Sequence, residues 1–189
     1  MPPELTDEAI AREALANQEA FGFLVERYEA KLARYLERLG LSVPEDREDV
    51  LQNAFIKAYM NLNSFDPSLS FSSWMYRIAH NEAMSFFRAK RARPSFALGE
   101  DGEALFASLA DDSADTAAFA EARLSEGQLA KAFVTLPPKY RDALTLRYFE
   151  GRSYGEMSDI LEVPVGTVST LIHRAKRALR DALPATFSP

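Results

Sequence analysis

The sequence predicts an all-α protein with two small helical domains. Apolar residues recur at helical spacing almost throughout the chain, and no alternating stretch is convincing as a strand. With 189 residues, 47% of them apolar, the chain can form one domain or two small ones. Residues 95–122 are acidic and have too little apolar periodicity to pack. We therefore expect an N-terminal domain at 1–94, a flexible acidic linker at 95–122 and a C-terminal domain at 123–189.

Four helices are expected in the N-terminal domain. The first begins after Thr6, where Asp7 and Glu8 suit the positive end of the helix dipole. Helical periodicity places the others at about residues 21–39, 45–62 and 71–90. A polar loop at residues 63–70 separates the last two, and Pro94 ends the fourth helix.

The C-terminal domain gives the strongest physical signal for function. Two helices come first, one starting near Leu124 and one at about residues 139–149. Ser153 and Glu156 have the spacing of a capping box, so a short helix should span residues 154–161. After a tight turn, a longer helix begins around residue 165. A short helix, a turn and a second helix with one apolar and one basic face form a helix-turn-helix, whose second helix enters the major groove of DNA.

The buried side of that last helix is expected to be an apolar stripe, and its other side is polar and basic. The stripe consists of Val168, Ile172, Ala175, Leu179 and Ala182. The opposite face consists of Ser169, Thr170, His173, Arg174, Lys176, Arg177 and Arg180. Such helices also occur in ordinary bundles, but this combination favours DNA binding.

The expected helix at 71–90 offers a second candidate surface. Arg77, Asn81, Ser85 and Arg88 step by four, four and three residues along one face. Such a row can follow a phosphate backbone and hydrogen-bond an unstacked base, with the preceding loop forming part of a pocket. A solvated helix face explains the same spacing at least as well. Trp74 falls on the apolar side and is expected in the core.

Composition narrows the function further. The net charge of −6 argues at first against nucleic-acid binding, but the cations gather in two local stripes. The chain has no cysteine, and its two histidines, His80 and His173, lie far apart and are expected at the surface, so no metal or other cofactor is expected. No nucleophile or carboxylate pair requires an active site. We expect a cytoplasmic protein, not an enzyme, without membrane insertion.

Four segments in a fixed order resemble a known family. They are residues 52–59 (QNAFIKAY), 71–81 (FSSWMYRIAHN), 154–157 (YGEM) and 164–169 (PVGTVS). Together they resemble the extracytoplasmic-function (ECF) sigma factors of bacterial RNA polymerase, over nearly the whole chain except the linker. The resemblance implies a subunit that binds core RNA polymerase and directs it to promoter DNA. It also implies an anti-sigma factor as a partner.

The resemblance implies a role for each surface. The polymerase-binding candidates, which pack on a coiled coil of its largest subunit, are Asp49, Gln52, Asn53 and Phe55; Asn53 stands where glutamate is usual. The candidates for capturing a flipped base of the minus-10 strand are Phe65, Ser68, Ser70, Arg77, Asn81, Ser85 and Arg88, with Asn81 as the base reader. The minus-35 reader is the C-terminal helix-turn-helix. There Thr170, His173 and Arg174 would read bases, while the remaining cations would meet phosphates.

Two other functions are alternatives to that of a sigma factor. A sigma mimic would have this fold and bind an anti-sigma factor without touching DNA. The absence of an arginine near Ser169 favours it, whereas Arg88, Arg91, Arg174 and Arg177 argue against it, because a mimic does not need groove-facing cations. A self-contained DNA-binding regulator would need a dimerisation element and an effector pocket, and neither is evident.

Overall fold

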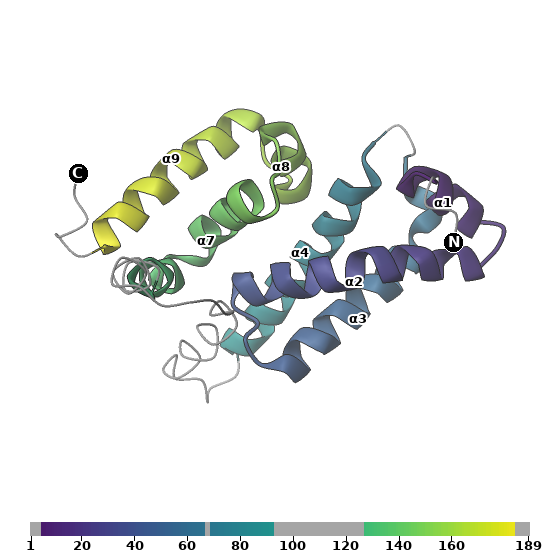
Figure 1. The fold of residues 1–189 in the computed structure, drawn as a ribbon, viewed down its shortest axis with the longest axis horizontal. Coiled ribbons are helices and arrows are strands. Elements are labelled where there is room, and N and C mark those ends of the chain that lie inside the picture. Colours follow the sequence, from purple (N-terminus) through teal and green to yellow (C-terminus); the bar gives the residue numbers. More distant parts are fainter. Residues whose placement is uncertain (1–4, 67–68, 93–126, 184–189) are drawn as a thin grey trace, which may run out of the picture.

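The computed structural model describes residues 5–66, 69–92 and 127–183 (Figure 1). This part of the chain is helical and contains no strand, which confirms the predicted all-α class. The linker expected at 95–122 lies outside the described residues. None of the helices described here is long and apolar enough to cross a membrane.

The N-terminal module follows the predicted order of helices. Its elements are α1 (Asp7–Ala14), α2 (Glu19–Leu39), α3 (Pro44–Met60), the 3-10 turn η1 (Leu62–Ser64) and α4 (Phe71–Ala92). Thr6 caps α1 by accepting the Ala9 N–H at 3.2 Å, as its position predicted. Gly40 ends α2 at φ 114°, a left-handed conformation that favours glycine. The helix α3 starts at Pro44, one residue before the predicted start, because proline suits the first turn of a helix, where no N–H donor is needed.

An aromatic cluster fixes the start of α4. Phe71 is fully buried and lies against the rings of Tyr28, Phe65 and Trp74 at centroid distances of 5.7, 5.3 and 5.5 Å. Its N–H donates to Glu8 Oε1 at 3.0 Å, so a side chain of α1 satisfies one free amide at the α4 N-terminus. Trp74 is buried, which confirms the prediction that it belongs to the core.

The C-terminal module contains the predicted helix-turn-helix. Its elements are a helix at residues 127–135, α7 (Pro138–Leu144), the π-helical turn η2 (Thr145–Phe149), α8 (Tyr154–Leu161) and α9 (Val165–Ala182). Both bonds of the capping box between Ser153 and Glu156 are present, and α8 has the predicted bounds. The apolar stripe of α9 is buried at Val168, Ile172 and Ala175 and becomes more exposed toward the end of the helix.

The two modules share one hydrophobic core. Met157 and Ile160 of α8 belong to the same cluster of buried residues as Ala79 and Ala83 of α4. The helix α8 packs on α4, and α7 packs on α2, whereas α9 lies on the outer side of α7 and α8 (Figure 1). A second, smaller cluster joins α7 to the later turns of α9. The mutual placement of the modules therefore rests on apolar burial.

Replacing Ile160 by alanine tests this shared core. Ile160 is fully buried, so we expect Ile160→Ala to lower the free energy of unfolding by about 2–5 kcal/mol. Urea unfolding followed by circular dichroism measures the loss, and one transition is expected for both modules. Val165→Ala, at a position 48% exposed, is the control and should change it by at most about 0.5 kcal/mol. Two separate transitions in the parent protein would contradict a shared core.

Candidate nucleic-acid interface

The basic face of α9 is open to solvent. All seven side chains expected on it are exposed: Ser169, Thr170, His173, Arg174, Lys176, Arg177 and Arg180. The Thr170 hydroxyl donates to the Gly166 carbonyl at 3.0 Å, which leaves its oxygen free to accept from a ligand. Within the described residues, Arg174 makes no ion pair. The face thus offers hydrogen-bonding groups near the helix-turn-helix turn and cations further along.

The row on α4 is a connected chain of polar groups. Asn81, Ser85 and Arg88 are exposed, and Arg77 is half-buried. Arg88 Nη2 donates to Ser85 Oγ at 2.9 Å, and Ser85 Oγ donates to the backbone carbonyl of Asn81 at 2.8 Å. Asn81 Nδ2 donates to Glu162 Oε2 at 3.2 Å, so the proposed base reader already has a partner in the other module.

The loop before α4 contributes less surface than expected. Phe65 is buried against Phe71 and Trp74 and therefore forms part of the core in this structure. Ser70 is exposed, and its hydroxyl accepts the Ser73 N–H at 3.3 Å. Ser68 lies outside the described residues.

The outer face of α3 combines polar and apolar groups. Asp49, Gln52 and Asn53 are exposed, whereas Phe55 is half-buried and packs on the core. Beyond Gln52 the row continues with Ile56, 49% exposed, and Met60, 73% exposed. The prediction omitted these two residues, although they follow Gln52 in steps of four residues in the sequence.

Sequence reasoning missed a polar junction between the modules. Tyr35 OH donates to Asp142 Oδ1 at 3.0 Å, and His80 Nδ1 lies 3.0 Å from Asp142 Oδ2. His80, expected at the surface or in a groove, is half-buried instead of fully exposed: its side chain is 13% exposed and contacts this buried carboxylate. Burial and the neighbouring Asp142 raise the pKa of Tyr35.

Glu150, which is half-buried, forms the second carboxylate contact of the junction. It accepts from Tyr76 OH at 2.6 Å and forms an ion pair of 3.0 Å with Arg38 of α2. Burial, with the hydrogen bond to Glu150, raises the pKa of Tyr76. Both tyrosines therefore act as neutral donors to carboxylates of the C-terminal module.

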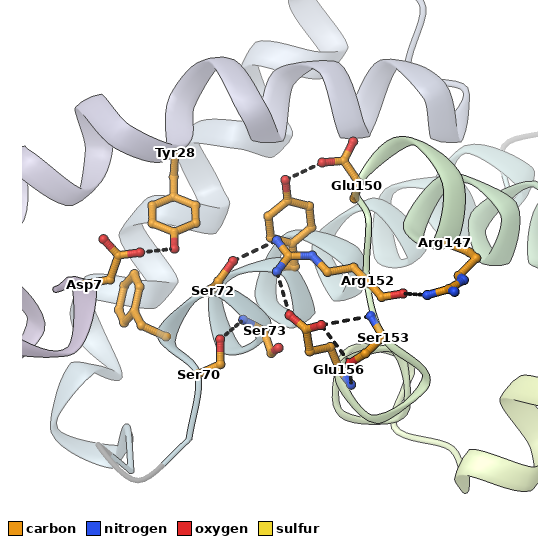
Figure 2. Close-up of polar contacts among 12 residues, drawn as sticks. Asp7, Tyr28, Ser70, Ser72, Ser73, Arg147, Glu150, Arg152, Ser153 and Glu156 are labelled. Atoms are coloured by element: carbon orange, nitrogen blue, oxygen red, sulfur yellow. Dashed lines mark hydrogen bonds and ion pairs between the residues drawn. The ribbon is translucent and has the colours of Figure 1, made fainter.

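Arg152 connects α4 to the start of α8. Figure 2 shows its guanidinium between Ser72, whose Oγ accepts at 2.8 Å, and Glu156 at 3.1 Å. It also lies 4.2 Å above the Tyr76 ring. Burial works to raise the pKa of Glu156, but the bonds from Ser153 and the charge of Arg152 outweigh it and lower that pKa. The capping box of α8 is thereby tied to the junction.

Alkaline titration tests the buried tyrosines. The pKa of Tyr28, Tyr35 and Tyr76 is raised above the ordinary value of 10.0, chiefly by burial. A folded pKa above the unfolded one stabilises the fold fully below pH 10, and this contribution is lost as pH rises through the folded value. We expect the last part of the phenolate absorbance change to coincide with loss of helical circular dichroism. Completion of the absorbance change in a fully helical protein would contradict this.

Comparison with known proteins gives the family. The family models for Sigma-70 region 2 and Sigma-70, region 4 match residues 24–93 and 126–179. The ECF RNA polymerase sigma factor SigW of Bacillus subtilis is 36% identical over 173 residues, 88% of this chain and 90% of SigW. The ECF RNA polymerase sigma-E factor of Escherichia coli K12 is 37% identical over 187 residues, 95% of each chain.

Solved structures have the same fold. CnrH, in complex with the cytosolic domain of CnrY, gives a TM-score of 0.66 at 28% identity and covers 93% of this chain and 95% of its own. The sigma factor RpoE, in complex with the anti-sigma factor NepR from Bartonella quintana, gives 0.63 at 20% identity, covering 86% of this chain and 95% of its own. With both modules matched, and relatives aligned along most of its length, the chain belongs to the ECF sigma factors of RNA polymerase.

Proposed function

We propose that this chain binds core RNA polymerase and directs it to specific promoters, where it reads minus-35 duplex DNA and holds the melted minus-10 strand. The observation that carries the proposal is the exposed basic face of α9 in a chain whose net charge is −6. Binding to a polyanion explains why cations gather on one face of a chain whose net charge is negative. Membership of the sigma factor family supports the same function.

The minus-35 contact is assigned to α9. Thr170, His173 and Arg174 read base edges in the major groove, while Lys176, Arg177 and Arg180 meet phosphates. Ser169 lies on the same exposed face, next to the turn. Lys176 Nζ lies 5.4 Å from the Tyr148 ring, which holds this cation near the protein surface.

The minus-10 contact is assigned to α4 and the loop before it. Asn81 hydrogen-bonds a base that has left the stack, and Arg77, Ser85 and Arg88 follow the strand. Ser68 and Ser70 complete this surface, and Phe65 supports it from the core beneath. Trapping the base compensates for lost stacking and stabilises the open strand.

Polymerase binding is assigned to the outer face of α3. Asp49, Gln52 and Asn53 supply a carboxylate and two amides that are free to pair, and Phe55 anchors the helix to the core behind them. We place the N-terminal domain at 1–94, the linker at 95–122 and the C-terminal domain at 123–189, a division that the family matches at 24–93 and 126–179 support. The chain acts in the cytoplasm, beside its polymerase, without a cofactor and without catalysing a reaction itself.

An anti-sigma factor is the further partner that we propose. CnrH, at 28% identity, was solved with the cytosolic domain of CnrY, and this supports a protein partner for the present chain. A sigma mimic would bind such a partner but not DNA.

Reconstituted transcription separates a sigma factor from a mimic. Purified chain is mixed with bacterial core polymerase and a library of promoter fragments, and the transcripts are sequenced. Transcripts starting from a defined subset of promoters support the sigma function. Failure to bind core polymerase, together with tight binding to an anti-sigma factor, would favour the mimic.

Replacing Arg174 by alanine tests the α9 contact. The plot of log binding constant against log salt for duplex DNA should become shallower by up to about 1, because a guanidinium that reads a base in the groove also lies within a Debye length of the flanking phosphates and displaces their counterions. Fluorescence anisotropy over a salt series measures the slope. Arg12→Ala, which removes an exposed cation from α1, is the matched control and should leave the slope unchanged. An equal slope for Arg174→Ala and the parent protein would exclude this helix face as the DNA contact.

A further inference from the structure

Glu162 has an unusual backbone conformation for its residue type. It ends α8 at φ 54° and ψ 42°, and it is the one non-glycine residue at positive φ in the described part of the chain. Side chains with a Cβ disfavour this left-handed conformation, and glycine usually takes the position after a helix. A glutamate at this position therefore destabilises the fold relative to glycine. This cost suggests that the Glu162 side chain has a role.

The side chain of Glu162 reaches the other module. Its Oε2 accepts from Asn81 Nδ2 at 3.2 Å, at the place where α8 packs on α4. The remainder of the junction holds α8 there, through Arg152 on Ser72 and Tyr76 on Glu150 (Figure 2). The strained turn thus brings a carboxylate to the amide at the head of the polar row on α4.

We propose that Glu162 is an intramolecular competitor of the single strand, a role that rests on the proposed function of Asn81. Asn81 Nδ2 has two N–H donors and Glu162 takes one of them, so a base that pairs with this amide must displace the carboxylate or lie against its negative charge. The negative charge of Glu162 also repels the phosphates of a strand that runs along Ser85 and Arg88. While Glu162 is bonded to Asn81, the free protein therefore binds single-stranded DNA more weakly.

The affinity for single-stranded DNA depends on the fraction of molecules in which the Asn81 side chain is not bonded to Glu162. When only a fraction of molecules can bind, the apparent dissociation constant is the intrinsic one divided by that fraction. Removing the Glu162 side chain frees the donor without separating the modules, because Met157 and Ile160 keep α8 in the shared core. The variant therefore tests the effect of Glu162 on strand binding while the other contacts between the modules remain.

Glu162→Gly tests the competitor directly. Glycine accepts the φ of 54°, so the variant is expected to fold, and circular dichroism with thermal unfolding checks this. The probe is a fluorescein-labelled pool of short, random-sequence single-stranded DNA, and anisotropy gives its dissociation constant for the full chain. We expect binding about three- to tenfold tighter than for the parent protein, the scale of one lost competing hydrogen bond.

Two further variants make the outcome decisive. Asp159→Ala removes an equal charge from an exposed position of α8 and should tighten binding much less. Asn81→Ala should weaken binding, and in combination with Glu162→Gly it should abolish the gain. If Glu162→Gly binds no tighter than Asp159→Ala while Asn81→Ala weakens binding, the competitor is excluded and the strand surface remains. If Asn81→Ala changes nothing in either background, the proposed strand surface fails, and the competitor with it.

Discussion

The packing of two carboxylates, Asp142 buried and Glu150 half-buried, determines how the modules can sit together. Asp142 and Glu150 of the C-terminal module lose water when the modules pack, and a buried carboxylate without partners is costly. Tyr35 and His80 meet the first, and Tyr76 and Arg38 meet the second. All four partners belong to the N-terminal module. The apolar cluster supplies the attraction, whereas these pairs specify one arrangement, because sliding the modules would leave charges buried and unpaired.

This arrangement leaves the two candidate DNA surfaces in different states. The basic face of α9 lies on the outer side of the molecule and is exposed along its length. The row on α4 lies beside α8, and its Asn81 amide is already paired with Glu162. On the proposed assignment, duplex DNA can reach α9 while the modules remain packed together, whereas a single strand at Asn81 meets the Glu162 carboxylate. This difference between the two surfaces suits a protein that binds melted DNA only after it has been positioned on duplex DNA.

The sequence predicted local structure better than contacts between modules. The capping box at Ser153, the stop at Gly40 and the core position of Trp74 depend on residues close in the chain, and all three were confirmed. His80 and Asp142 are 62 residues apart in the chain, and no pattern around either residue indicates that they are in contact. On a single helix, a polar residue that contacts another module has the same spacing as a solvated one. Phe65 was expected on the strand-binding loop because its position in the sequence shows only that it precedes α4, whereas its burial depends on packing against the rings of Phe71 and Trp74.

The junction also contains groups that it does not satisfy. Two buried side-chain atoms of the junction, Arg141 Nε and Arg152 Nε, have no hydrogen-bond partner among the described residues. Burial lowers the pKa of Arg141, whose guanidinium packs where a Cβ on Gly40 would come within 3.2 Å of it. Water would satisfy every one of these groups if the modules separated, and it would also solvate Asp142 and Glu150. Opening therefore returns hydration free energy that offsets the lost apolar burial, so partners that bind the separated modules need to supply only the difference.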